Sequence, residues 1–205
     1  MSNQKKIDKL TLFLIPIGVA VNFVGGQIAI LLRLPVYLDS IGTIVVGGLC
    51  GGIPGAIVGL ISNVLNSISS PTTLFYAPLS IAFGLSAAFF SKRKVFLNFG
   101  KTLLSALWFA FVGGVCGACI TMLVNGGDFG PITASLYAAA IQGVTGWGVF
   151  PCQLVSEFFM DLIDKAITII VCFGVFKALP NRLLSKVKFG SVYAKEEKSE
   201  ETEEE

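Results

Sequence analysis

Six stretches dominated by apolar residues follow one another along the chain, separated by segments rich in glycine, proline and polar side chains. A helix needs about 20 mostly apolar residues to cross the hydrocarbon core of a bilayer, and several of these stretches approach or reach that length. The pattern therefore predicts an all-α membrane protein with six transmembrane helices, at about residues 11–32, 38–50, 55–67, 74–90, 102–124 and 152–179.

The second and third stretches are short and meet at Gly51-Gly52-Ile53-Pro54, which is a strong turn signal. Short hydrophobic helices interrupted by glycine occur where a membrane protein lines a cavity. We therefore expect these two helices to border a polar interior.

Lysine and arginine gather before the first stretch, between the fourth and the fifth, and after the sixth. With six spans these clusters fall on one side of the membrane, which the positive-inside rule identifies as cytoplasmic. Both termini are therefore predicted to be cytoplasmic. In the connections on the opposite side, Arg33 is the only lysine or arginine. The clusters are Lys5, Lys6 and Lys9; Lys92, Arg93, Lys94 and Lys101; and Lys177, Arg182, Lys186 and Lys188.

Hydrophobic residues make up 54% of the 205 residues and charged residues only 14%, against about 25% charged in a typical soluble domain. The composition therefore favours a multi-pass protein of a cell membrane, in contact with lipid. Residues 1–180 are interpreted as one six-helix transmembrane substrate-binding domain. Residues 181–205 are interpreted as a cytoplasmic, disordered tail, because the chain from Lys195 to Glu205 is charged and has no apolar residues.

The residue types needed for common enzyme chemistry are missing. Without histidine there is neither a Cys/His zinc site nor the usual general base of hydrolases. Gly100-Lys101-Thr102 resembles the end of a phosphate-binding loop, but Val95 stands where that loop requires glycine. The five cysteines lie in or beside apolar stretches as packing residues, and the net charge of +2 indicates no nucleic-acid partner. We predict no enzyme activity, no catalytic residues, no metal and no cofactor.

Small residues spaced four apart mark the faces on which these helices approach other helices. In the fifth stretch this stripe is expected to pack within the protein. In the first and third stretches two interpretations stay open, packing within the protein and docking of another membrane protein. The stripes are Ala106, Ala110, Gly114 and Ala118 in the fifth stretch, Gly18, Asn22 and Gly26 in the first, and Gly55, Gly59 and Asn63 in the third.

Polar and aromatic residues concentrate in the three connections opposite the basic clusters. They are candidate substrate-binding residues, although the alternative is that they only contact water and headgroups. In the longest connection, 125–151, we expect a short helix at 132–142 over the outer mouth, between glycine-rich hinges. The candidates are Arg33, Tyr37, Asp39, Asn63, Asn66, Ser67, Tyr76, Gln142 and Trp147.

The sixth stretch carries Glu157, Asp161 and Lys165 four residues apart, so they share one helix face, with Asp164 beside it. At about 1.5 Å per residue from Cys152, Lys165 lies roughly 20 Å deep. A lone ion there costs at least ~2.5 kcal/mol, so these groups are expected to be paired or solvated. We predict a structural ion pair among Asp161, Asp164 and Lys165, with substrate contact still open. Glu157 and Asp161 are substrate-ligand candidates, Glu157 being nearer the outer mouth.

Together these features resemble the S components of energy-coupling factor (ECF) transporters, over residues 10–179. The resemblance is carried by the six spans with both ends inside, by Leu38-Asp39-Ser40-Ile41-Gly42-Thr43, by the Gly-Gly-Ile-Pro-Gly turn into Gly59-Leu60-Ile61-Ser62-Asn63, and by Glu157, Asp164 and Lys165. It implies a substrate-specific subunit of a prokaryotic plasma membrane that captures a water-soluble vitamin or related micronutrient at its outer face. It also implies a transmembrane coupling subunit and two cytoplasmic ATPases as partners.

In that family a small-residue stripe on the first helix docks the coupling subunit. The matching positions here are Gly18, Asn22 and Gly26, with Gly25 and Ala29 as another option. Two other classes of function stay open, a multi-span membrane sensor module and a self-sufficient secondary carrier. The residues do not identify one vitamin: Tyr76 and Trp147 offer ring faces for stacking, while Asn63, Asn66 and Glu157 offer hydrogen bonds.

Overall fold

A computed structural model describes residues 8–194, and within that range the chain forms helices and no β-strand. The predicted tail from Lys195 to Glu205 lies outside the described residues. The α-helices are α1 (Lys9–Leu31), α2 (Ile41–Cys50), α3 (Gly52–Asn66), α4 (Ala77–Lys92), α5 (Phe99–Val124), α6 (Thr133–Thr145), α7 (Val149–Ala178), α8 (Asn181–Leu184) and α9 (Gly190–Tyr193), with 3₁₀ helices η1 (Pro71–Tyr76) and η2 (Val95–Leu97).

Three helical segments are long and apolar enough to cross a membrane: α1, α5 and the continuous segment Pro71–Lys92 formed by η1 and α4. Helices α2 and α3 are apolar but shorter. Helix α7 has 30 residues and carries Glu157, Asp161, Asp164 and Lys165 within it. The described chain is therefore an all-α protein with three candidate membrane spans, two shorter apolar helices and one long helix with ionisable residues.

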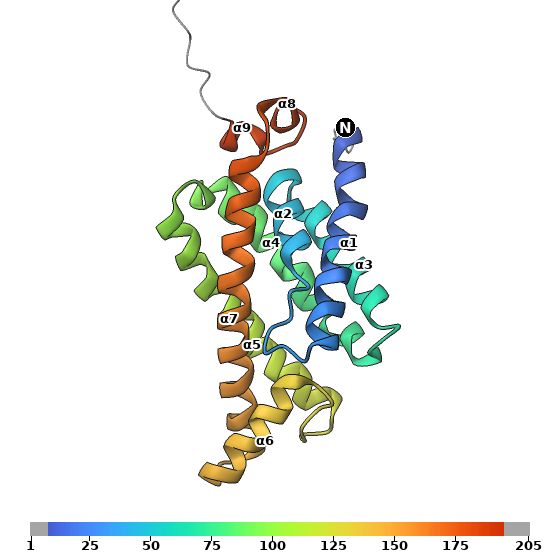
Figure 1. Cartoon of the computed structure of the whole chain (residues 1–205), viewed down its shortest axis with the longest axis vertical. Coiled ribbons are helices and arrows are strands. Elements are labelled where there is room, and N and C mark those ends of the chain that lie inside the picture. The colour runs from blue at the N-terminus through green and yellow to red at the C-terminus, as the bar shows by residue number, and fades with distance from the viewer. Residues whose placement is uncertain (1–7, 195–205) are drawn as a thin grey trace, which may run out of the picture.

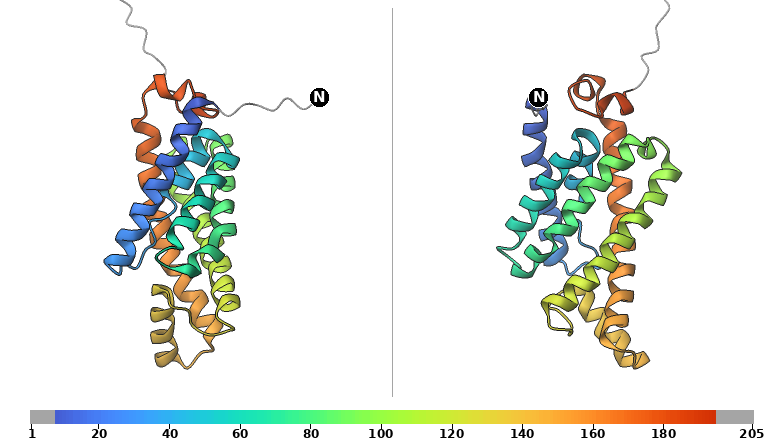
Figure 2. Two further views of the ribbon diagram at one scale, coloured as in Figure 1. Left: turned by 90° about the vertical axis from the view of Figure 1, so that its right-hand side faces the viewer. Right: turned by 180° about the vertical axis from the view of Figure 1, so that it is seen from behind.

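The helices run up and down between two ends of the molecule (Figures 1 and 2). Helices α1 to α4 pack on one another, and α5 packs mainly along α7. The start of α1, the connection between α4 and α5, and helices α8 and α9 lie at one end. Helix α6, which covers most of the range expected for the short helix, lies at the other end against α7.

The hydrophobic core occupies the half of the molecule near α8 and α9. Phe96 and Phe176 approach with ring centroids 5.2 Å apart, and Phe109 is fully buried beside them in the same cluster. Helix α2 contributes Ile44 and Leu49, which are almost completely buried. Aromatic and aliphatic packing therefore closes this half, whereas polar side chains concentrate in the other.

The small-residue stripes of α1 and α3 pack inside the protein. A Cβ placed on Gly42 would overlap the backbone of Gly18, so α1 and α2 cross in direct backbone contact. Of the two interpretations left open for these stripes, the structure supports packing within the protein, because the residues are buried between helices and present no exposed surface to a partner. They are Gly18, Asn22 and Gly26, which face α2, α3 and the 36–39 segment, and Gly55 and Gly59, which face α2 and α4.

Asn22 is the polar centre of this packing. Its Nδ2 donates to Thr43 Oγ1 at 2.8 Å and to Ser62 Oγ at 3.0 Å, and its Oδ1 accepts from the Gly42 N–H at 2.6 Å. One side chain of α1 thus binds α2 and α3 together. Because a buried amide needs such partners, the position is explained without a second protein.

The structure also differs from the expected tail over residues 181–194, which fold against the helical bundle. Leu184 and Tyr193 are buried, and the Phe189 N–H donates to the last turn of α2 at Leu49 O over 2.9 Å. The Tyr193 hydroxyl donates to Ser91 Oγ at 2.6 Å, which itself donates to Gly48 O at 2.6 Å. Burial raises the pKa of Tyr193, so this hydroxyl keeps its proton. The charge of this segment predicts a solvated tail, but the apolar residues between its lysines, such as Leu184, are buried against the bundle.

Candidate functional site

A cavity of about 230 Å³ lies in the polar half of the molecule. Its walls come from α1, the 36–39 segment, the end of α3, η1, α4, α5, α7 and the residues around the start of α6. Seven of the eleven candidate substrate-binding residues line it, although they come from separate parts of the chain: Tyr37, Asp39, Asn63, Asn66, Tyr76, Glu157 and Asp161.

Four candidates lie outside the cavity lining, so their predicted binding role is not supported by their position. Arg33 is exposed in the connection after α1. Ser67 donates to Val64 O of its own helix at 2.7 Å. Gln142 donates to Trp147 O at 3.1 Å, and the Trp147 side chain is half exposed. These residues were grouped with the site because they share its end of the molecule, which does not bring them into the cavity.

Glu157 is held by a chain of hydrogen bonds that crosses the cavity wall. Its Oε1 accepts from Thr121 Oγ1 at 2.5 Å and from Gln153 Nε2 at 2.8 Å. Since Thr121 donates to Glu157, the Tyr76 hydroxyl donates to Thr121 Oγ1 at 2.6 Å. Helices α5 and α7 and the η1 segment therefore fix one carboxylate oxygen of Glu157 in place.

The same chain reaches α6. Gln153 Oε1 accepts from Ser135 Oγ at 3.0 Å, and Ser135 Oγ accepts from the Gly130 N–H at 3.0 Å. Ser156 Oγ donates to Ala134 O at 2.6 Å. Helix α6 is therefore attached to the helix that carries Glu157, and the segment before it closes one side of the cavity.

Two glycines of α5 make room for the carboxylates of α7. A Cβ on Gly113 would lie 2.6 Å from Asp161 Oδ1, and a Cβ on Gly117 would overlap Glu157 Oε2. Both glycines line the cavity. Any side chain at these positions would displace the carboxylates, so glycine at this spacing belongs to the site as well as to the packing of α5 on α7.

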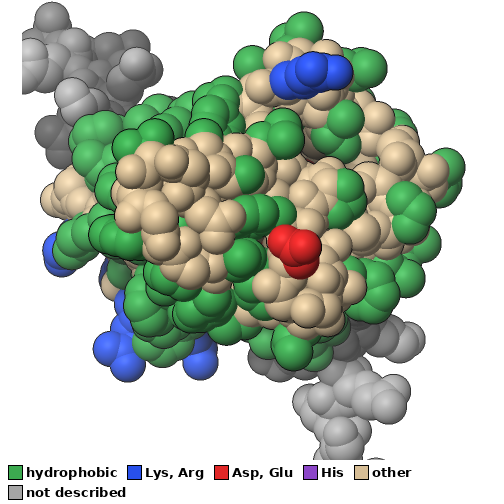
Figure 3. Space-filling model, turned by 90° about the horizontal axis from the view of Figure 1, so that it is seen from below, with side chains coloured by type: hydrophobic (Ala, Val, Ile, Leu, Met, Phe, Trp, Pro, Cys, Tyr) green, Lys and Arg blue, Asp and Glu red, His purple; other side chains and the backbone are tan. Residues whose placement is uncertain are grey.

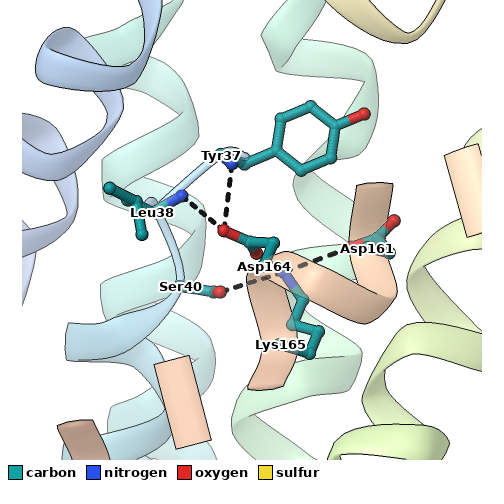
Figure 4. A network of polar contacts seen from close by, with 6 residues as sticks. All are labelled: Tyr37, Leu38, Ser40, Asp161, Asp164 and Lys165. Carbon is teal, nitrogen blue, oxygen red and sulfur yellow. Dashed lines mark hydrogen bonds and ion pairs between the residues drawn. The ribbon is translucent and has the colours of Figure 1, made fainter. Parts of the chain in front are cut away.

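Asp164 and Lys165 form the buried polar network drawn in Figure 4. Lys165 Nζ lies 2.5 Å from Asp164 Oδ2, 3.3 Å from Asp161 Oδ1 and 3.1 Å from Ser40 Oγ. The ion pair predicted from the spacing on this helix is thus present in the structure. Lys165 Nζ also lies 4.7 Å from the centroid of the Phe83 ring.

Asp164 fixes the segment that carries Tyr37 and Asp39 to the cavity. Its Oδ1 accepts from the backbone N–H groups of Tyr37 at 2.9 Å and Leu38 at 2.7 Å (Figure 4). Leu38 has φ +55°, a left-handed conformation that is unfavourable for a branched side chain. Two charge-assisted hydrogen bonds offset that cost, so Asp164 determines where Tyr37 and Asp39 lie.

The amide side of the cavity is formed by Asn63 and Asn66. Asn63 Nδ2 donates to Gly59 O at 2.9 Å and to Ser80 Oγ at 2.6 Å, which uses both of its amide hydrogens. Asn66 Oδ1 accepts from Gln27 Nε2 at 3.4 Å. Among the described residues, the Asn63 side-chain oxygen and the Asn66 amide nitrogen therefore remain available for other contacts.

Sequence reasoning missed Thr121, Gln153, Ser135, Gly113 and Gly117. A signal existed for three of them. Gln153 precedes Glu157 by four residues and extends the polar stripe of α7, and the two glycines lie four apart on α5. Thr121 and Ser135 have no such mark, because their roles depend on contacts between helices.

The end of the molecule that carries α6 exposes mainly hydrophobic and uncharged polar side chains, with few charged groups (Figure 3). Within residues 8–194 no group of three or more His, Cys, Asp or Glu side chains is arranged to hold a metal ion. Comparison with protein-family models, with curated proteins and with solved structures gives no match.

Proposed function

We propose that this protein is the substrate-binding membrane subunit of an ECF-type importer in a prokaryotic plasma membrane. It binds a water-soluble vitamin or related micronutrient at its outer face and delivers it to the cytoplasm with a transmembrane coupling subunit and two ATPases. The observation that carries the proposal is the cavity. In a hydrophobic helical protein, polar groups from three connections and from α7 line one cavity. Such concave sites with a few convergent polar groups are typical of small-molecule binding.

The proposed topology has six membrane crossings, by α1, α2, α3, α4, α5 and α7, with both termini in the cytoplasm. Support comes from the basic residues around α8 and the α4–α5 connection, which lie at the same end as the start of α1. Helix α2 has 10 residues, about 15 Å, so it crosses only together with the 36–40 segment that precedes it. The cavity is lined by residues at the end of α3 and around the start of α6, and we assign this end of the molecule to the outer face.

The topology is tested by labelling introduced cysteines in a variant whose five native cysteines are replaced by alanine. Leu136 in α6 and Arg182 in α8 are both exposed and lie at opposite ends of the molecule. A membrane-impermeant thiol reagent applied to intact cells is expected to label Leu136→Cys and to leave Arg182→Cys unlabelled. Labelling of Arg182→Cys alone would reverse the orientation and remove the outer site.

The binding function is tested on protein purified in mild detergent, by mass spectrometry of the small molecules that remain bound. The affinity for the compound found is then measured for Asn66→Ala and Glu157→Ala. Each change removes a polar group that lines the cavity and is expected to weaken binding about ten- to hundredfold, the effect of one to two hydrogen bonds. Unchanged affinity in both variants would place the ligand elsewhere.

The control variant is Ser67→Ala. Ser67 follows Asn66 directly, lies outside the cavity lining and hydrogen-bonds its own helix, so its removal is expected to leave affinity unchanged. Dependence on partners is tested separately, by uptake in cells that make this chain without the coupling subunit and the ATPases. Uptake in such cells would show a self-sufficient carrier and overturn the coupled part of the proposal.

A further inference from the structure

The positive charge in the cavity is already used within the protein. Among the described residues Lys165 is the only basic side chain in the lining. An ammonium group has three N–H donors, and those of Lys165 have three partners, in Asp164, Asp161 and Ser40. No donor of Lys165 is left for a carboxylate or phosphate group of a ligand. The cavity therefore offers no free cationic group to an anionic ligand.

Carboxyl groups, in contrast, remain available. Asp39, Glu157 and Asp161 all line the cavity. Asp164 lies closest to Lys165 and also accepts the two backbone N–H groups, so it is the carboxylate that compensates the lysine. Glu157 has only the uncharged donors Thr121 and Gln153. The cavity thus holds more carboxylates than its one ammonium group compensates.

Glu157 is the carboxyl group that a cationic ligand would compensate most directly. The side chain is 2% exposed, and both of its hydrogen bonds within residues 8–194 reach Oε1. Its Oε2 lies beside Gly117, and both Glu157 and Gly117 line the cavity. A buried carboxylate without a cation is costly and takes up a proton instead, so a positively charged ligand is the partner that would keep Glu157 ionised in the cavity.

The remaining walls indicate an organic ligand. Tyr37, Tyr76 and Phe83 contribute aromatic rings, and apolar residues such as Leu79 and Val36 also line the cavity. Ring faces attract cationic nitrogen groups, and a metal ion would instead need several oxygen ligands at one point. The described residues offer no cluster of three such side chains.

We infer that the ligand of this cavity is a small organic cation, whose positively charged nitrogen is bound between Glu157 and Asp161 and whose carbon framework lies against the aromatic rings. The inference rests on the proposed function, since it takes the cavity as the substrate site. It narrows the substrate class to compounds with a protonated amine or a cationic heterocycle, and it excludes those whose only charge is negative.

The experiment exposes the purified protein to the small-molecule fraction of a rich bacterial growth medium, removes unbound material and identifies retained compounds by mass spectrometry after denaturation. The compound enriched most is expected to carry a positive charge at pH 7. Glu157→Gln keeps the size and the acceptor oxygen but removes the charge, and is expected to retain at least tenfold less of that compound. Asp39→Asn provides a second charge-removing variant outside the ion pairs, and is expected to retain severalfold less.

The control is Asp128→Asn, an exposed carboxylate outside the cavity, which is expected to retain the wild-type amount. A neutral or anionic compound, retained equally by Glu157→Gln and Asp39→Asn, would overturn the inference while leaving the binding function intact. If wild-type protein that elutes as a single folded species retains no compound, the binding function itself is contradicted, and the inference falls with it.

Discussion

Replacing Lys165 with methionine is expected to destabilise the protein by about 3–5 kcal/mol, the cost of removing one partner from a buried ion pair. The substitution keeps a long apolar side chain beside Phe83, so its effect comes from the charge. Asp161 and Asp164 would remain buried, 4% and 0% exposed, with no ammonium group between them. The measurement is thermal and denaturant-induced unfolding of the purified protein in detergent.

The matched control is Lys177→Met, on the same helix, where the lysine is exposed and lies 5.3 Å from the Phe173 ring centroid. It is expected to change stability by less than about 0.5 kcal/mol. Adding Asp164→Asn to Lys165→Met is expected to restore part of the loss, because the asparagine oxygen still accepts from Tyr37 and Leu38. Equal stability of Lys165→Met and Lys177→Met would mean that charge does not stabilise the buried cluster of Asp161, Asp164 and Lys165.

Replacing Gly117 with alanine is expected to weaken ligand binding about a hundredfold with little effect on folding. The new methyl group would overlap Glu157 Oε2, so the carboxylate must leave its present position in the cavity wall. A hydrogen bond to a charged group contributes about 1.5–3 kcal/mol, and two powers of ten correspond to the upper part of that range. Gly113→Ala is expected to displace Asp161 and therefore also to weaken its ion pair with Lys165, which adds a loss of stability. Both are measured by equilibrium binding of the co-purified compound.

Gly174→Ala is the control for these variants, since it lies on α7 with no atom near enough to contact a new Cβ. It is expected to bind the ligand as the wild type does. If Gly117→Ala binds normally while its fold is intact, Glu157 Oε2 does not touch the ligand, and the cavity is occupied in another way.

Several features of the site follow from the order of residues within one helix. Asp161 and Lys165 pair because residues four apart share a helix face, and that spacing is visible in the chain. The short helix near residue 132 and the turn at Gly51 also follow from local signals. These predictions succeed because each depends on neighbours in sequence.

Other features depend on which helix faces which. Asp164 binds the backbone of Tyr37 and Leu38, which precede it by 127 and 126 residues, and no local pattern connects them. The spacing of Gly18, Asn22 and Gly26 is compatible with contact to a partner protein or to a neighbouring helix. In the structure these residues pack against the neighbouring helices α2 and α3. Spacing shows where a helix can be approached closely, but not by what.

From the sequence alone came the helical character, the order of the apolar stretches and the polar stripe of α7, because helix periodicity and hydrophobicity are properties of single segments. Only the tertiary structure decided which polar groups meet in one cavity, that Lys165 has no donor to spare, and that residues 181–194 pack on the bundle. These depend on distances between segments far apart in the chain, and such distances are set by the packing of whole helices against one another.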